Sequence, residues 1–304
     1  PSCSIDVTLA FLHAQRLLQV CNISWKKLWT PKLKINSREM LAPQYVCYLC
    51  LLLRFFTKAR LVYDAHELET ETHTMRGLRR ILARVVERLC IHRADAHVFV
   101  SGSIARWYEK RYGLAQTHVV RNVPTTPTGP TPDRTNGLRR KFDIGEGAQL
   151  FLHQGMLQSG RGIEVMLAAF AELPSRNHIV LLGFGDLVDE IKRKAELHPN
   201  IHYHEPVPPE ELAGVTQQAD VGLHLIPNTC LNHNYCLPNK LFEYTHAGVP
   251  FIASDLPEIG NVAREFECGW TVEPSAKDLR QRIHALDTAA LKTARAGCRR
   301  LAKE

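Results

Sequence analysis

The sequence has no hydrophobic run long enough to span a bilayer. Its longest apolar stretch, residues 45–56, has 12 residues and is interrupted by Arg54, whereas a transmembrane helix needs about 20. We expect this stretch to form a buried helix. The chain does not open with a basic and then apolar signal region, and it begins with Pro1 rather than Met, so we expect the start of the gene product to be missing.

Paired cysteines are also lacking. The nine cysteines are an odd number without paired spacing, which is typical of reduced thiols in a cytoplasmic protein. Cys47 and Cys50 have the spacing of a redox or zinc pair, but they lie inside the apolar stretch and no second pair follows at a suitable distance. We therefore expect no metal site here.

Several catalytic signatures are absent. The chain has no Gly-x-Ser-x-Gly elbow, no His-Glu-x-x-His and no carboxylate-rich metal loop, which disfavours hydrolysis by a serine triad or a bound metal. Gly183-Phe-Gly185 follows an apolar run, but the third glycine of a dinucleotide fingerprint would fall at Val188. On the residues alone, we expect close packing there rather than NAD binding.

Charge is distributed unevenly along the 304 residues. The net charge is +7, and residues 1–124 hold 19 lysines and arginines against 9 aspartates and glutamates. A basic first part indicates an anionic partner, such as a membrane surface or an anionic lipid-linked substrate. Nucleic acid is disfavoured because stacking aromatics do not interleave with the basic residues. A merely solvated charged surface is the alternative.

Strand and helix patterns alternate along the first part. Residues 60–63 read as a strand ending at Asp64-Ala-His-Glu67, and residues 77–93 read as a basic helix with apolar positions at Ile81, Leu82, Val85, Val86 and Leu89. Further strands are expected at 96–100 and 118–120, around a helix at 104–112. Residues 125–137, rich in Pro, Gly and Thr, are expected to form a linker.

The alternation resumes beyond the linker and predicts a second parallel sheet. Strands are expected at 149–153, 178–182, 201–204, 221–226, 251–253 and 270–272, with helices at 163–173, 187–198, 209–219, 238–248, 259–266 and 277–303. The predicted fold is α/β, with two Rossmann-like doubly wound domains facing a cleft. Their predicted bounds are 1–124 and 138–275, with a C-terminal helical segment at 276–304.

Two charged residues stand on the helix expected after Pro238. Lys240 would lie in its first turn, where the helix dipole disfavours a cation, and a bound anion would remove that conflict. Glu243 lies three residues on, along the same face. The alternative is a solvated ion pair worth a few tenths of a kcal/mol.

Two other stretches carry candidate chemistry. The glycines of the 155–162 loop let backbone N–H groups approach an anion before a helix, and Arg161 can hold phosphate oxygens bidentately. His66 follows a strand directly, between Asp64 and Glu67. Parallel sheets place ligand contacts at such strand ends.

Together these motifs resemble the family-4 glycosyltransferases of GT-B fold. The resemblance covers roughly residues 33–275 and is carried by motifs in the family's order and spacing: Tyr63-Asp-Ala-His-Glu67, the Gly155–Gly162 loop, Leu182-Gly-Phe-Gly185, Ala219-Asp-Val-Gly222, Asn239-Lys-Leu-Phe-Glu-Tyr244 and Ala247-Gly-Val-Pro250.

The resemblance implies retaining transfer of a sugar from a nucleoside diphosphate sugar to a glycan or lipid-linked acceptor. It implies no required metal and no cofactor besides the donor, and a cytoplasmic enzyme that is peripheral on the inner face of the membrane. Arg161 and Lys240 match the diphosphate contacts, Glu243 the carboxylate that binds the ribose, and His66 the histidine near the transferred sugar. Further donor contacts are implied at Gly155, Gly162, Gly183, Gly185, Asn239 and Leu241.

The chain departs from the family pattern in three places. Tyr235 stands where a carboxylate is common, so we expect the sugar-hydroxyl contact to be absent or to come from Asn232, Asn234 or the backbone. Met156 stands near the place of a common arginine. The opening strand and glycine-rich acceptor loop are missing from the pattern, so the chain is expected to be a fragment.

Two alternative functions remain open on the sequence. A nucleotide-sugar epimerase of the same fold would bind the same donor, but it would need paired acid and base carboxylates at the sugar carbon. A truncated domain that binds nucleotide without transferring sugar is the other alternative.

Overall fold

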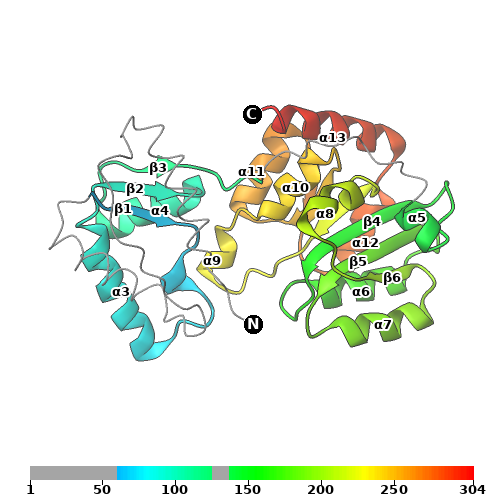
Figure 1. Cartoon of the computed structure of the whole chain (residues 1–304), viewed down its shortest axis with the longest axis horizontal. Helices are drawn as coiled ribbons and strands as arrows, with labels where there is room; N and C mark the ends of the chain where they lie inside the picture. The colour runs from blue at the N-terminus through cyan, green and yellow to red at the C-terminus, as the bar shows by residue number, and fades with distance from the viewer. Residues whose placement is uncertain (1–59, 125–136) are drawn as a thin grey trace. The chain divides into compact units, whose positions relative to one another are not determined.

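The computed structural model describes residues 60–124 and 137–304, which belong to one unit, Ala59–Glu304. The first described stretch forms β1 (Val62–Ala65), the short 3-10 helix η3 (Glu69–Glu71), α3 (Gly77–Ile91), β2 (Ala96–Phe99), α4 (Gly102–Tyr112) and β3 (His118–Val119). The three strands form a parallel sheet in the order β1-β2-β3 (Figure 1). A serine begins α4: the Ser101 hydroxyl accepts a hydrogen bond from the N–H of Ile104.

Helix α3 buries a different face from the one its apolar pattern picks out. Ile81, Leu82, Val85 and Leu89 are between 41% and 58% exposed. The buried side chains of α3 are instead Ala83, Val86, Glu87, Cys90 and Ile91. The apolar pattern therefore identifies the helix correctly, but only one of its five positions, Val86, faces the interior.

A buried carboxylate explains this orientation. Glu87 is 6% exposed and accepts hydrogen bonds from the hydroxyls of Tyr63 at 3.1 Å, Tyr108 at 2.8 Å and Tyr112, and from the hydroxyl of Thr70 at 3.2 Å. A buried carboxylate is tolerated only when it is well hydrogen-bonded. These donors come from β1, α4 and the segment before α3. The apolar pattern of α3 alone could not predict them.

The second described stretch alternates strands and helices. Its elements are α5 (Leu138–Lys141), β4 (Gln149–Met156), α6 (Ile163–Ala171), β5 (Asn177–Phe184), α7 (Val188–Leu197), β6 (Ile201–His204), α8 (Pro209–Thr216), β7 (Val221–His224), α9 (Leu231–Asn234), α10 (Asn239–His246), β8 (Phe251–Ser254), α11 (Pro257–Phe266), β9 (Gly269–Val272), α12 (Ala276–His284) and α13 (Thr288–Leu301). The strands form a parallel sheet in the order β6-β5-β4-β7-β8-β9.

This strand order confirms the doubly wound arrangement. The chain runs from β4 outward to β6, returns to β7 beside β4, and then continues to β9, so the strand order reverses between β4 and β7. Alternate residues of β4 enter separate cores: Leu150 and Leu152 pack in one, and Phe151 packs in the other. Both faces are covered by helices, as buried parallel sheets require (Figure 1). Ligands of such sheets bind at the carboxyl ends of the strands where the order reverses.

The element boundaries differ from the predictions in several respects. β1 begins and ends two residues later than the strand predicted at 60–63, so Asp64 belongs to the strand and not to the loop after it. β4 and β5 continue through Gly155 and Gly183, which were predicted to begin loops. The single helix predicted at 277–303 is two helices, because the Asp287 side chain accepts the Ala290 N–H at 2.7 Å and caps α13. The sequence also did not predict the one-turn helices α5 and α9.

Some predictions lie outside the described residues. These are the helix at 45–56 with Cys47 and Cys50, and the linker apart from Gly137. Within residues 60–124 and 137–304, no helix combines the length and the apolar character needed to cross a bilayer.

Candidate functional site

Gly155, near the carboxyl end of β4, leaves room for a lysine side chain from α10. The φ angle of Gly155 is +116°. A Cβ atom added there would lie 2.6 Å from Cε and 2.8 Å from Nζ of Lys240, so a larger residue would displace the ammonium. The strand end and the first turn of α10 therefore meet where the strand order reverses.

The Lys240 ammonium lies in a partly buried, charged environment. Burial lowers its pKa, Glu243 raises it, and Arg161 lowers it. The charge of the ammonium is therefore influenced by both of these groups. Because it also stands in the first turn of α10, next to the positive end of the helix dipole, an anion bound beside it would relieve repulsion from both Arg161 and the helix.

Glu243 is held by a buried chain of polar side chains. Its Oε2 accepts a hydrogen bond from Nε2 of Gln154 at 2.6 Å, and Oε1 of Gln154 accepts one from the Thr216 hydroxyl at 2.8 Å. Gln154 and Thr216 are each 1% exposed. The chain fixes Glu243 between α8, β4 and α10. Neither partner was predicted from the sequence, although a glutamine near the end of an apolar strand indicates a polar contact there.

Arg161 stands between two glycines of the loop that joins β4 to α6. Gly160 and Gly162 have φ angles of +77° and +74°, and Gly162 is the N-cap of α6. A Cβ atom on Gly162 would lie 2.3 Å from the carbonyl oxygen of Leu225, so only glycine fits there. The loop thus presents an exposed guanidinium beside the first turn of α6, where backbone N–H groups favour anions.

Two buried histidines lie near these cations. His153 of β4 and His224 of β7 are 1% and 4% exposed, and their ring planes differ by only 3°. Burial, reinforced by the charge of Lys240, lowers the pKa of His153 to about 4. The same two causes lower the pKa of His224 well below its ordinary value. Both rings are therefore neutral at pH 7 and add no positive charge near Lys240. The sequence analysis did not identify them.

Four residues predicted as donor contacts lie in different surroundings: two glycines are at close backbone contacts, Leu241 is buried and Asn239 is exposed. A Cβ atom on Gly183 would lie 1.8 Å from the carbonyl oxygen of Gly155, and one on Gly185 would lie 2.3 Å from that of Leu157. These glycines permit close packing of β5 against β4, as expected from the residues alone. Leu241 is fully buried, and its N–H donates to the Pro238 carbonyl, so it supports the helix. Asn239 is exposed at the start of α10.

His66 follows β1 and is paired with Asp64. Its Nε2 lies 3.5 Å from Oδ2 of Asp64. The hydrogen bond to Asp64 raises the pKa of His66, against the lowering effect of partial burial, and Glu67 raises it further. The structure therefore favours a protonated imidazole at this strand end. Lys240 and Glu243 lie on α10, and Arg161 lies in the loop between β4 and α6.

Both side-chain polar atoms of Asn232, one of the residues considered for the sugar contact, form hydrogen bonds within the protein. Its side-chain oxygen accepts the Leu68 N–H at 2.8 Å, and its side-chain nitrogen donates to Glu67 at 2.9 Å. The side-chain oxygen of Asn234 likewise accepts a hydrogen bond, from Asn228 at 3.2 Å. Long-range partners such as Glu67 cannot be read from local spacing.

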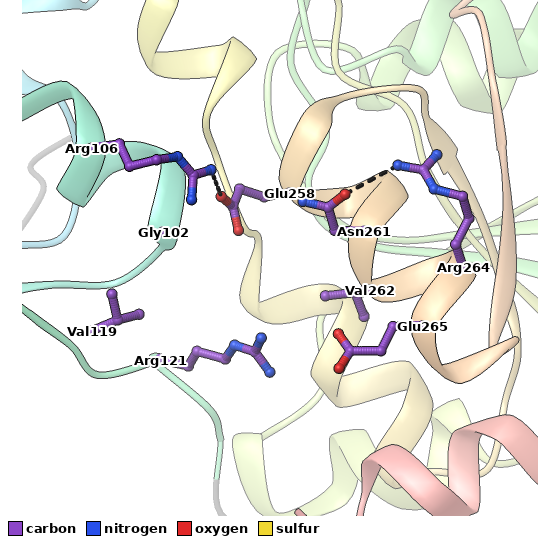
Figure 2. Close-up of a pocket in the computed structure, with 9 residues that line it drawn as sticks. All are labelled: Gly102, Arg106, Val119, Arg121, Glu258, Asn261, Val262, Arg264 and Glu265. Atoms are coloured by element: carbon purple, nitrogen blue, oxygen red, sulfur yellow. Dashed lines mark hydrogen bonds and ion pairs between the residues drawn. The ribbon is translucent and has the colours of Figure 1, made fainter.

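A charged cavity of about 510 Å³ lies between helix α4, the end of β3 and helix α11 (Figure 2). Its charged lining residues are Arg106, Arg121, Arg264, Glu258 and Glu265. Glu258 is largely buried, accepts the Ser103 N–H at 2.6 Å and lies 3.8 Å from the Arg106 guanidinium. Its carboxylate thus stabilises the start of α4. None of the predicted donor contacts lines this cavity.

Comparisons with known proteins agree with this architecture. Residues 148–288 match a family model described as "Glycosyl transferases group 1". No curated protein sequence gives a significant match.

Solved structures match most of the described chain. HepE from Anabaena, crystallised with UDP, is 17% identical over 86% of this chain and 72% of its own, with a TM-score of 0.69. Sucrose-phosphate synthase from Thermosynechococcus elongatus is 20% identical over 86% and 67%, with a TM-score of 0.68. WaaG, a glycosyltransferase involved in lipopolysaccharide biosynthesis, is 17% identical over 91% and 82%, with a TM-score of 0.60. The fold is that of the GT-B glycosyltransferases, as the sequence predicts.

Proposed function

We propose that this chain is a glycosyltransferase that moves a sugar from a nucleoside diphosphate sugar to a glycan or lipid-linked acceptor. The observation that carries the proposal is that Lys240 packs against Gly155 where the strand order reverses, with Glu243 on the same helix and Arg161 in the loop that follows β4. The match of residues 148–288 to a glycosyltransferase family supports it, and so do the complexes of HepE with UDP and with UDP-glucose.

The two cations suit the departure of a diphosphate. As the glycosidic bond breaks, negative charge grows on the leaving phosphate, and positive groups already in place stabilise that charge. Arg161 can hold two phosphate oxygens, and Lys240 supplies a second positive charge beside Gly155. We propose that these residues take the place of a metal, and that the transferred sugar retains its anomeric configuration.

The carboxylate of Glu243 suits the ribose of the donor. A ribose hydroxyl pair can donate hydrogen bonds to a carboxylate, and Gln154 fixes the Glu243 side chain from behind through its 2.6 Å hydrogen bond. Hydrogen bonds to a charged group are each worth about 1.5–3 kcal/mol. This residue therefore sets donor affinity in the proposal.

Nucleoside diphosphates are expected to raise the melting temperature of the chain. One of UDP, GDP or ADP, at 100 times its dissociation constant, should stabilise the chain by about 2.7 kcal/mol. Replacing Glu243 by alanine should remove most of this shift at the same concentration, because the ribose loses its acceptor. Differential scanning fluorimetry measures both effects.

The control is Glu196→Ala, which removes an exposed carboxylate on α7 and should leave the nucleotide shift unchanged. Each shift in melting temperature is measured between the same variant with and without nucleotide. A general loss of stability in Glu243→Ala therefore does not affect the comparison. A Glu243→Ala protein that keeps the full shift would refute the ribose assignment. Formation of an epimer from the sugar donor without acceptor would favour the epimerase alternative.

We also propose that the enzyme works on the cytoplasmic face of an anionic membrane. The support is the solvent-facing stripe of α3, in which Leu78, Ile81, Leu82, Val85 and Leu89 are all exposed. At 100° per residue, the exposed Arg79 and Arg88 flank this stripe on opposite sides. A basic amphipathic helix of this kind suits the surface of anionic lipids, where a lipid-linked acceptor would be found.

Vesicle binding tests the stripe. The protein should sediment with vesicles that contain phosphatidylglycerol and should bind pure phosphatidylcholine vesicles at least about tenfold more weakly, since each basic residue near the surface adds about 1 kcal/mol. Leu82→Glu should weaken the binding to anionic vesicles. Leu197→Glu on α7, which replaces a leucine that is 72% exposed, is the matched control. Equal loss in both variants would argue against this stripe.

A further inference from the structure

One buried asparagine joins α9 to the loop that carries His66. Asn232 is 8% exposed, and both of its side-chain polar atoms are used. Oδ1 accepts the backbone N–H of Leu68 at 2.8 Å, and Nδ2 donates to Oε2 of Glu67 at 2.9 Å. We call this pair of hydrogen bonds the Asn232 clasp. α9 and η3 are in contact, and the clasp joins α9 to the two residues that precede η3.

The two partners of the clasp directly follow His66. On the other side of the histidine, residues 64–65 belong to β1 and are held by parallel pairing with β2. His66 is therefore the single residue between a strand and the two residues that Asn232 holds. Its backbone is fixed from both sides, and one of the two anchors comes from residue 232.

Apolar packing surrounds the Leu68 side of the clasp, whereas Glu67 on the other side is exposed. Leu68 is fully buried in the core cluster of the first sheet, and Leu231 and Tyr235 pack against the same cluster. The Ser101 hydroxyl adds a hydrogen bond to the backbone carbonyl of Tyr235 at 3.3 Å. The hydrogen bond from the Leu68 N–H to Asn232 is buried, and hydrogen bonds in low-dielectric surroundings are stronger than in water, which supports a defined geometry at residue 68.

The segment that carries Asn232 leads directly into α10. Cys236 and Leu237 pack against the core cluster to which Leu241 belongs, and α10 begins at Asn239. The path from the clasp to Lys240 is therefore eight residues long and is packed along its course. The clasp therefore lies on a covalent and hydrogen-bonded route from His66 to Lys240 of the proposed donor site.

We propose that Asn232 is a positioning residue, whose amide sets His66 at the correct distance from Lys240 and Glu243. This inference rests on the proposed sugar transfer. A displacement of about 1 Å can cost 10²-fold in rate, so the clasp would control turnover. Donor affinity would not depend on it, because Arg161, Lys240 and Glu243 keep their own supports.

Reversing the polarity of the clasp gives a sharp test. Asn232→Asp places two carboxylates against each other and should lower kcat about 10- to 100-fold, with donor KM changed less than about threefold. In the double variant Asn232→Asp/Glu67→Gln, the introduced amide can donate to the introduced carboxylate, whose other oxygen still accepts the Leu68 N–H. We expect kcat to return to within about threefold of the original value.

The matched control is Asn228→Asp, an exposed position on the same segment, which should leave kcat unchanged. A second cycle combines Asn232→Asp with His66→Ala. If Asn232 acts through His66, the combined variant should be about as slow as His66→Ala alone. Three results would each overturn the inference. The first is a kcat loss in the Asn232→Asp/His66→Ala variant that equals the product of the two single losses. The others are a lack of rescue by Glu67→Gln, and a raised donor KM at unchanged kcat. The raised KM would indicate a direct sugar contact instead.

Failure of the proposed function gives a different result. A chain that shows a nucleoside diphosphate shift but no transfer would refute the transferase proposal and with it the positioning role. Thermal unfolding of the original protein, of Asn232→Asp and of Asn232→Asp/Glu67→Gln would still test the clasp itself. The double variant should then regain the melting temperature lost in Asn232→Asp, and its failure to do so would refute the hydrogen-bonded geometry.

Discussion

Replacing Arg161 by alanine is expected to lower kcat/KM for sugar transfer by about 10²- to 10³-fold, the usual cost of removing one group that stabilises developing charge. Arg161 is held at the start of α6 by glycines with positive φ on both sides. Its loss would leave Lys240 as the one cation identified at the described diphosphate site. Initial rates with the nucleoside diphosphate sugar that gives the largest melting shift measure the effect.

Two companion variants make this result specific. Arg161→Lys keeps the charge but loses the bidentate geometry, so its rate should fall between those of the original protein and Arg161→Ala. Arg193→Ala removes an exposed arginine on α7 and should leave kcat/KM unchanged. Full activity in Arg161→Ala would show that the diphosphate is bound elsewhere.

Replacing His66 by alanine is expected to lower kcat by about 10²-fold while donor affinity changes little. The proposed role of His66 is exerted on the transferred sugar and leaving phosphate as the bond breaks, so its loss should appear in turnover. The Asp64 hydrogen bond raises the pKa of His66 and so favours its charged form. If that charge assists departure of the phosphate, kcat should fall as the pH rises through this pKa. The pH–rate profile of His66→Ala should not show this fall.

The control for this prediction is His73→Ala. His73 is exposed on the segment before α3, so its replacement should change neither kcat nor the pH profile. Rates measured between pH 5 and 9 together with nucleotide melting shifts separate turnover from binding. Equal losses of kcat and of donor affinity in His66→Ala would argue against a transition-state role.

Local patterns predicted the second sheet well. β6 (Ile201–His204) has the predicted bounds, and β8 and β9 are each only one residue longer than predicted. Buried parallel strands are short apolar runs between helices, so their signal is local. The ends of β4 and β5 were less predictable. Gly155 and Gly183 resemble turn residues, but they are paired with each other in neighbouring strands.

The candidate site was predictable in part. Spacing placed Lys240 in the first turn of a helix and Arg161 in a glycine loop, and both positions are found. The side chains that hold the neighbouring site residues in place could not be predicted from the sequence. Gln154 and Thr216 hold Glu243 from two other elements, and Asn232, first considered for a sugar contact, bonds to Glu67. Such pairs are 62 to 165 residues apart in sequence, and one sequence carries no local signal for them.

By itself, the amino-acid sequence determined the alternation of strands and helices, the parallel sheets, and the charged residues that end the strands. These follow from apolar periodicity, glycine and capping signals, which act over a few residues. Only the tertiary structure decided which face of α3 is buried, where the Gln154 and Asn232 amides are used, and that Lys240 fits against Gly155. Those outcomes depend on whether a buried polar group finds a partner, and the partner is supplied by a distant part of the chain.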